Sequence, residues 1–245
     1  MMKRLSFFAL AFTLPMFGAS GPAKAADAGN LNLYCTVQEE WCRPMVEAFE
    51  KATGVKVAMT RKSSGEFYAQ LKAEASNPRG DIWWGGTGDP HLQAAEENLT
   101  EPYTSPNNSQ LNDWALRQWQ QSKNRTIGVY AGALGYSYNT DLFKKKGGAE
   151  PKCWADLTDP RFKNDVQVAD PNASGTSYTM LATIIQLMGE DKAWDYYKNL
   201  HKNINQYTKA GAAPAMAVKQ GESMIGITFQ HDAVVAALEI GRAHV

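Results

Sequence analysis

The sequence predicts an α/β fold with a mainly parallel sheet, and two observations support this class. The period of the apolar residues alternates along the chain between two and about 3.6, as expected where strands and helices alternate. Residues 31–97 follow the order strand, helix, strand, helix, strand, helix. Strands that alternate with helices favour parallel pairing in one sheet.

Residues 1–25 are typical of a secretory signal peptide. Lys3 and Arg4 form a positive start, residues 5–19 are mostly apolar, and Ala23 and Ala25 are the small residues that a signal peptidase requires. A transmembrane anchor is the alternative, but the run is short for a span and no second one follows. The sequence therefore predicts export, and a periplasmic location where the source has an outer membrane.

The charge balance limits the partners of the exported chain. The sequence has 25 basic and 25 acidic residues, and the leader holds three of the basic ones and no acid. The exported chain is therefore three units net negative, which argues against nucleic acid or an anionic membrane as a partner. Its length allows one large domain or two small ones.

The exported chain contains three cysteines, Cys35, Cys42 and Cys153. In an oxidising compartment Cys35 and Cys42 are close enough in sequence for a short disulfide, and two unbridged core cysteines are an equal alternative. No histidine has a Cys or His at the spacing of a zinc site. No metal and no other cofactor is predicted.

Three strand–helix units are expected in the first part of the chain. The strands are at residues 31–35, 55–59 and 81–84. The helices are at residues 39–53, 63–75 and 90–97. Trp83 and Trp84 end the third strand and should point to opposite faces of the sheet.

Three strand ends lead into small, hydroxyl-rich loops that each open a helix. These loops contain Ser63, Ser64, Thr87, Gly88, Ser174, Gly175 and Thr176. Ligands of α/β sheets bind beyond the carboxyl ends of the strands, and a helix start offers free N–H donors and a positive dipole end. Ser and Thr are also ordinary N-caps, which explains any one loop without a ligand. Three such loops together predict a pocket for an oxyanion or phosphate.

The middle of the chain is expected to cross between two domains. Residues 125–139 contain two short apolar strands separated by small residues, which could act as a hinge. Residues 141–221 are again helix-rich α/β, and residues 224–229 form a strand that carries the chain back. The predicted division is a first lobe at 26–130, a second lobe at 131–228, and a return toward the first lobe at 229–245.

Several runs resemble the periplasmic solute-binding proteins of ABC importers. They are YCTVQEEWCRPMVEAFEKATGVKV, DIWWGGTGDPHLQAAEE, CWADLTDPRFKNDVQVADPNASGTSY and NINQYTKAGAAPAMAVKQGE, and the resemblance covers nearly all of residues 30–238. More narrowly, the chain is similar to the AfuA-type sugar-phosphate group in the ferric-iron-binding-like branch of the type II binding proteins. The resemblance implies two α/β lobes, joined by two crossing strands, that close on a ligand. It also implies a membrane permease and a cytoplasmic ATPase as partners of a monomeric binding protein.

The resemblance distinguishes two ligand classes. Ferric binders of this family hold the metal with two neighbouring tyrosines near the second crossover, where this chain has His231 and Asp232. Tyr196 and Tyr197 are adjacent but lie in a helical pattern, which weakens the iron alternative. In the sugar-phosphate group a His-Asp pair at this place contacts sugar hydroxyls, and hydroxyl-rich loops hold the phosphate. The predicted ligand is a sugar phosphate or related organophosphate, with ferric iron as the alternative.

A structural role is the alternative for His231, and the tryptophans pose a similar choice. Trp41, Trp83 or Trp84 could stack on a sugar ring, although core packing is the expected role of each. The sequence contains no G-x-S-x-G elbow, no H-E-x-x-H pair and no P-loop. No enzymatic activity is therefore predicted.

The last residues of the sequence do not resemble the family. Residues 239–245 read EIGRAHV, which is what a common sequencing adapter encodes when it is read through in frame. The family pattern implies further elements that complete both lobes. The sequence therefore predicts a C-terminally truncated fragment of a longer protein, ending in non-native residues.

Overall fold

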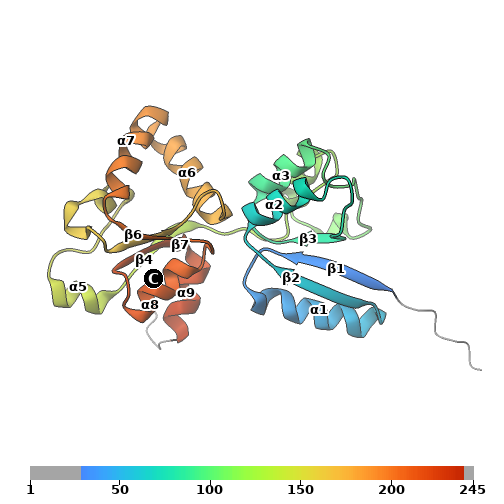
Figure 1. The fold of residues 1–245 in the computed structure, drawn as a ribbon, viewed down its shortest axis with the longest axis horizontal. Helices are drawn as coiled ribbons and strands as arrows, with labels where there is room; N and C mark the ends of the chain where they lie inside the picture. Colours follow the sequence, from blue (N-terminus) through green and yellow to red (C-terminus); the bar gives the residue numbers. More distant parts are fainter. Residues whose placement is uncertain (1–28, 240–245) are drawn as a thin grey trace, which may run out of the picture.

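The computed structural model describes residues 29–239, which form two α/β bodies side by side (Figure 1). The first lobe is built on a three-stranded sheet and the second lobe on a four-stranded sheet. The predicted signal peptide at residues 1–25 lies outside the described residues, as do residues 240–245 of the predicted non-native run 239–245.

The first lobe contains a parallel sheet of order β2-β1-β3, as the periodicity predicted. Its strands are β1 (Asn30–Cys35), β2 (Lys56–Arg61) and β3 (Ile82–Trp84). Its helices are α1 (Glu39–Thr53), α2 (Ser64–Ala73), α3 (Gly88–Glu96) and α4 (Asp113–Gln121), with a 3-10 turn at Asn108–Gln110. Helix α1 lies on one side of the sheet, and α2 and α3 lie on the other (Figure 1).

The second lobe contains a mixed sheet of order β4-β7-β5-β6. Strand β4 is antiparallel to β7, whereas β5 pairs in parallel with β6 and β7. The strands are β4 (Leu134–Tyr138), β5 (Val166–Ala169), β6 (Ile204–Thr208) and β7 (Ile225–Phe229). The helices are α5 (Thr140–Lys146), α6 (Gly175–Met188), α7 (Glu190–His201), α8 (Ala213–Gln220) and α9 (Gln230–Glu239), with 3-10 turns at Trp154–Thr158 and Pro160–Phe162.

The larger hydrophobic core belongs to the second lobe. Its buried side chains include Phe143, Leu157, Phe162, Ile184 and Ile225, which come from both faces of the sheet and from the turns that cover it. The strand Val166–Ala169 is buried along its whole length, as expected for a central parallel strand covered by helices on both faces. Ser177 Oγ, in the first turn of α6, donates to the Ala169 carbonyl at 2.5 Å and ties the start of this helix to the end of β5.

The segment that links the lobes differs from the expectation of two short strands. Residues 134–138 form β4, but residues 125–133 form no strand. The N–H of Gly128 donates to the carbonyl of Ala115 at 3.4 Å, in α4, so this stretch bonds to a helix instead of a ladder. The prediction of a strand before residue 131 was therefore wrong.

Helix α9 packs on the second lobe, while His231 and Asp232 near its start contact Trp41 and Gln38 of the first lobe. Helix α9 contacts α8, β4 and β7, and it buries the small side chains of Ala233 and Ala236. Small residues allow this close approach between a helix and the sheet behind it. The predicted return toward the first lobe at residues 229–245 stays a prediction.

A disulfide joins Cys35 at the end of β1 to Cys42 in α1, which answers the question that the sequence left open. Both cysteines are fully buried, and Trp41, Met59, Trp84 and Tyr130 pack around them. Cys153 is free and exposed. The bridge ties the loop after β1 to the helix that follows it.

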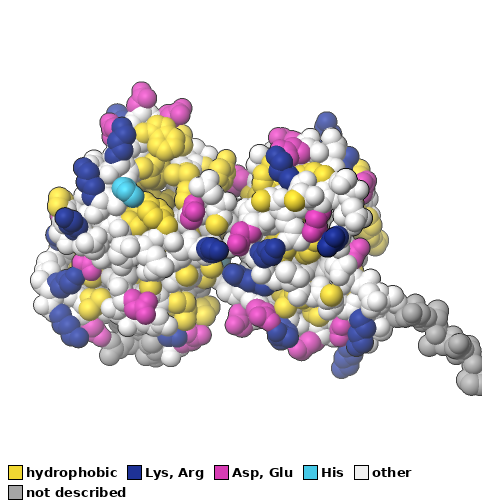
Figure 2. Space-filling model, viewed as in Figure 1, with side chains coloured by type: hydrophobic (Ala, Val, Ile, Leu, Met, Phe, Trp, Pro, Cys, Tyr) yellow, Lys and Arg dark blue, Asp and Glu magenta, His cyan; other side chains and the backbone are white. Residues whose placement is uncertain are grey.

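The surface carries charges of both signs. Figure 2 shows basic and acidic side chains interspersed over both lobes on the face drawn, with a notch where the lobes meet. Within residues 29–239, no helix has the length and apolar character that crossing a membrane requires.

Candidate functional site

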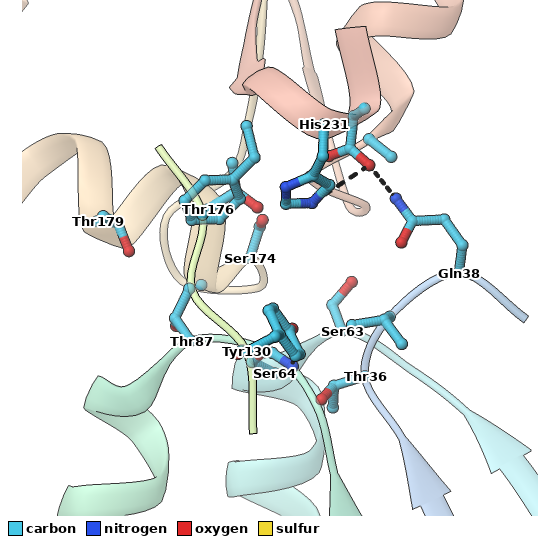
Figure 3. A pocket seen from close by; sticks show the side chains of 18 of the residues that line it. Thr36, Gln38, Ser63, Ser64, Thr87, Tyr130, Ser174, Thr176, Thr179 and His231 are labelled. Carbon is cyan, nitrogen blue, oxygen red and sulfur yellow. Dashed lines mark hydrogen bonds and ion pairs between the residues drawn. The ribbon is translucent and has the colours of Figure 1, made fainter. Parts of the chain in front are cut away.

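A pocket of about 320 Å³ lies between the two lobes, and every predicted site residue lines it. These residues are Ser63, Ser64, Thr87, Gly88, Ser174, Gly175, Thr176, His231 and Asp232. Figure 3 shows the hydroxyl side chains of the first lobe facing those of the second across the pocket, with His231 at one end. Predicted residues from four separate stretches of the chain are thus brought to one place.

Three helices begin at this pocket. Ser63, Thr87 and Ser174 are the N-cap residues of α2, α3 and α6, and each has an extended backbone conformation. The first N–H groups of a helix have no acceptor within it, and the helix dipole places partial positive charge there. Arg61 adds a guanidinium to the lining, and its Nε donates to the Val37 carbonyl at 3.0 Å. The helix starts and Arg61 therefore give this part of the pocket groups that suit an anion.

The hydroxyl groups of the pocket are not equivalent. Ser63 Oγ donates to the carbonyl of Lys209 at 2.8 Å, so this hydroxyl already joins the two lobes. Thr87 Oγ1 is buried and has no hydrogen-bond partner among the described residues. A buried hydroxyl without a partner is costly, so Thr87 keeps an unused hydrogen-bonding group at the pocket.

Replacing Thr87 with valine should weaken anion binding without destabilising the free protein. Valine keeps the size of the side chain but removes the hydroxyl, and a hydrogen bond to a charged group contributes about 1.5–3 kcal/mol. Because the hydroxyl has no partner in the protein, its loss should leave the free energy of unfolding unchanged or slightly raised. Calorimetry measures the affinity of the Thr87→Val variant for the anion, and urea unfolding measures its free energy of unfolding. Unchanged affinity would leave Thr87 as a simple N-cap.

Gln38, from the loop after β1, and Asp232, at the start of α9, close the other end of the pocket. The Asp232 carboxylate accepts from the side-chain amide of Gln38, across the lobes (Figure 3). It also accepts from Thr228 Oγ1 at 3.1 Å. His231 Nε2 lies 3.7 Å from the same carboxylate, and its ring stacks on Phe229. Burial raises the pKa of the Asp232 carboxyl. This end of the pocket offers both hydrogen-bond donors and acceptors, which the hydroxyl groups of a ligand require.

Several lining residues were not predicted from the sequence. Thr36 and Gln38 directly follow β1, and Arg61 ends β2, so the rule that ligands bind beyond strand ends could have found them. Tyr130 also lines the pocket, but it lies in the linking segment and no local pattern marks it.

None of the three tryptophans considered for ring stacking lines this pocket. Trp41 packs on Tyr130 and His231, Trp83 stacks on His91, and Trp84 lies against the disulfide. The expectation of core packing is met by Trp83 and Trp84. Trp41 does not line the pocket, but its ring packs against His231, which does.

A larger hollow of about 970 Å³ lies beside β3. All of its lining residues fall between Tyr34 and Tyr130, so it belongs to the first lobe and its linking segment. The start of α6, which is one of the three donor-rich helix starts, contributes no residue to this hollow. The smaller pocket between the lobes is therefore the better candidate for an anion.

The adjacent tyrosines lie away from the pocket. Tyr196 and Tyr197 belong to the core of the second lobe, and Tyr197 Oη donates toward the carbonyls of Met180 and Leu181. Burial raises the pKa of both hydroxyls, which disfavours the phenolate form that ferric iron needs. Within residues 29–239, no cluster of three His, Cys, Asp or Glu side chains could hold a metal ion.

His91 supports the loop that carries Thr87 and should make stability depend on pH. Its Nε2–H donates to the Gly85 carbonyl at 2.8 Å, and burial lowers its pKa from 6.5 to about 4. Between these values the unfolded chain binds more protons than the folded one. The contribution of neutral His91 is therefore complete above pH 6.5 and is lost as the pH falls toward 4.

The slope of unfolding free energy in this window should reach about 1.4 kcal/mol per pH unit from His91 alone. His91→Gln keeps a donor but cannot titrate. The free energy of unfolding of this variant should therefore change less steeply with pH than that of the wild type between about pH 6.5 and pH 5. Urea unfolding of both proteins across this range measures the difference. Equal slopes would mean that His91 protonates without cost.

The family model for bacterial extracellular solute-binding proteins matches residues 87–241. A protein of Haemophilus influenzae is 44% identical over 215 residues, which cover 87% of this chain and 61% of that protein. The Fe(3+)-binding periplasmic protein of Serratia marcescens is 25% identical and covers 92% of this chain and 63% of its own. The chain thus spans about three fifths of the length of these relatives.

Among solved structures, this chain is similar to the periplasmic binding protein AfuA of Actinobacillus pleuropneumoniae with fructose 6-phosphate bound. The two share 43% sequence identity with a TM-score of 0.80, over 86% of this chain and 66% of that one. The two-lobed architecture is thus that of the type II periplasmic binding proteins, as the sequence predicted.

Proposed function

Because the chain belongs to the family of bacterial extracellular solute-binding proteins, we propose that it is the extracytoplasmic solute-binding component of an ABC importer. Its ligand is an anionic organophosphate, with a sugar phosphate as the first candidate. The pocket between the lobes captures this ligand, and the protein delivers it to a membrane permease driven by an ATPase. The family serves transport, and no reaction is assigned to the chain.

The observation that carries this proposal is the meeting of three helix starts at one pocket. Two of these helices, α2 and α3, come from the first lobe, and α6 comes from the second. An anion held there touches both lobes, so its binding favours their approach. The hydroxyl of Thr87, buried without a protein partner, is the donor that such a ligand would satisfy.

The second end of the pocket supports a ligand that carries hydroxyl groups. Gln38, His231 and Asp232 line it and can donate to or accept from a sugar. The volume of about 320 Å³ is at the small end of ligand pockets, which suits one monosaccharide phosphate better than a larger molecule. The bound fructose 6-phosphate of AfuA is a ligand of this class.

The location and partners are part of the same proposal. Relatives are named as periplasmic proteins, and the leader at residues 1–25 would direct export. The protein acts as a monomer in the periplasm, and its partners are the permease and ATPase of the importer. Its mixed surface charge gives no platform for nucleic acid on the face drawn in Figure 2.

The iron alternative rests on the relative from Serratia marcescens that is named for Fe(3+) binding. Ferric iron prefers several anionic oxygen ligands, whereas the described lining contributes two carboxylates, Asp89 and Asp232. The remaining oxygen groups are mostly neutral hydroxyls. This donor set favours a polar phosphate ester over a bare metal ion.

A thermal-shift panel tests the proposed function. A ligand that binds only the folded state stabilises it by RT ln(1 + [L]/Kd), roughly 2.7 kcal/mol at a hundredfold excess over Kd. Fructose 6-phosphate or glucose 6-phosphate should raise Tm, and ferric citrate should leave it nearly unchanged. A large shift with iron together with a visible charge-transfer band would overturn the proposal and support the metal alternative.

A further inference from the structure

We propose that His91 and Tyr130 are positioning residues that turn the carbonyl groups of the loop at residues 84–86 away from the anion, so that this loop presents donors to the pocket. The inference rests on the proposed function, because it explains how the pocket accepts a phosphate. Neither residue was predicted as part of the site, and His91 does not line the pocket.

Three successive carbonyl groups of this loop each have a donor bound to them. The Trp84 carbonyl accepts from Thr36, through the backbone N–H at 3.0 Å and Oγ1 at 3.1 Å. The Gly85 carbonyl accepts from His91 Nε2 at 2.8 Å. The Gly86 carbonyl accepts from Tyr130 Oη at 3.1 Å. A carbonyl oxygen carries partial negative charge, so any of the three, turned into the pocket, would repel a phosphate.

The loop backbone needs such restraints because it is unusually free. Gly85 and Gly86 both have left-handed φ values, +83° and +87°. Consecutive glycines in this region can rotate the peptide between them with little steric resistance. Gly86 also cannot be replaced by a larger residue without a clash, because an added Cβ would lie 2.3 Å from Ser64 Oγ. External hydrogen bonds therefore decide which way the peptide groups face.

The two anchoring rings are themselves held by aromatic packing. His91 stacks on Trp83 with the ring centroids 3.8 Å apart. Tyr130 packs against Trp41 and Trp84 with centroid distances of 5.6 and 6.0 Å. Tyr130 Oη also accepts from the Gly86 N–H at 2.8 Å, so it holds both polar groups of one residue. These contacts fix the donors in place before a ligand arrives.

The result of this arrangement is seen at Thr87, the next residue. As the N-cap of α3 it follows the restrained glycines, and its Oγ1 remains without a protein partner. Gly175 of the second lobe approaches this hydroxyl so closely that an added Cβ would lie 2.2 Å from it. The loop thus offers its hydroxyl and the start of α3 to the pocket, with its carbonyls bound elsewhere.

Two variants test the proposal, with a rescue and a matched control. His91→Phe keeps a ring to stack on Trp83 but removes the donor to Gly85, and Tyr130→Phe removes only a hydroxyl. Each should weaken fructose 6-phosphate binding roughly tenfold by calorimetry. His91→Gln restores an N–H donor and should recover most of the lost affinity. Tyr68→Phe removes a hydroxyl that bonds to Glu97 on the surface of the first lobe and should change nothing.

A titration of the bound ligand separates this role from a merely structural one. With a carbonyl freed toward the pocket, the second pKa of bound fructose 6-phosphate, followed by phosphorus NMR, should be higher in His91→Phe and Tyr130→Phe than in the wild type. The charged and titratable residues that line the pocket are unchanged in His91→Phe, and they are Arg61, Asp89, Tyr130, His231 and Asp232. A shift in the ligand pKa therefore reports the loop.

The outcomes distinguish this inference from the proposed function. If the wild type binds fructose 6-phosphate and both phenylalanine variants bind it equally well, the inference is wrong and the proposed function stands. If the variants lose affinity only in proportion to a lower Tm, with no rescue by His91→Gln and no change in the ligand pKa, the role is structural and the inference is again wrong. A wild type that binds no organophosphate overturns the proposed function and, with it, this inference.

Discussion

Replacing Gly65 with alanine should weaken ligand binding by roughly 5- to 150-fold while leaving the stability of the first lobe intact. Gly65 lies in the first turn of α2, and its N–H donates to the Ala173 carbonyl of the second lobe at 2.9 Å. An added Cβ would lie 2.2 Å from the Asn172 oxygen and 2.9 Å from that of Ala173. Both are backbone atoms, so the clash is relieved only by moving the lobes apart.

The cost of such overpacking is typically about 1–3 kcal/mol, which sets the expected loss of affinity. Within α2 alone, alanine is a better helix former than glycine, so the lobe should not unfold more easily. Calorimetry with fructose 6-phosphate measures the affinity, and small-angle scattering measures the separation of the lobes.

Gly135→Ala is a matched control for this variant. Gly135 lies in β4, and its added Cβ would meet nothing closer than Gln230 Cγ at 3.4 Å, which is ordinary contact. Its affinity should remain close to that of the wild type. If Gly65→Ala binds as tightly as the control and scatters identically, the described approach of the lobes is not the ligand-binding arrangement.

Removing the disulfide with Cys35→Ala and Cys42→Ala should lower the free energy of unfolding by roughly 2–3 kcal/mol. The bridge closes a loop between residues only seven apart, and both sulfurs are buried in the small core of the first lobe. The loop that it closes contains Thr36 and Gln38, which line the pocket. Affinity should therefore fall along with stability, because these two side chains become less well ordered.

Urea unfolding followed by tryptophan fluorescence checks this prediction, since Trp41 and Trp84 pack against the bridge. Cys153→Ala is the control, because Cys153 is free and exposed and its removal should have little effect. If a reductant leaves the urea unfolding midpoint of the wild type unchanged, the bridge does not stabilise the protein.

The sequence predicted most of the fold because its signals were local. Strands β1, β2 and β3 and the helices that follow them show clear periodicity, and parallel pairing follows from their alternation. The three donor-rich helix starts were found for the same reason, since the pattern of a strand, a Ser or Thr, and a helix is local.

The features that the sequence missed depend on contacts between distant residues. Residues 125–133 have the composition of a strand, but Gly128 finds its acceptor in α4. Tyr130 and His91 matter because of the carbonyl groups that they meet, and nothing in their own neighbourhood reveals which ones. Gln38 lies 194 residues from Asp232 in the sequence, so the pairing of these two side chains across the pocket could not be read locally.

The central claim is that one pocket recognises a phosphate at the helix starts and hydroxyl groups at His231 and Asp232. Isothermal titration calorimetry of the purified protein with fructose 6-phosphate, inorganic phosphate and fructose tests it most directly. The account predicts tight binding of fructose 6-phosphate, much weaker binding of phosphate, and no measurable binding of fructose. Equal affinity for phosphate and fructose 6-phosphate, or no binding of either, would contradict it.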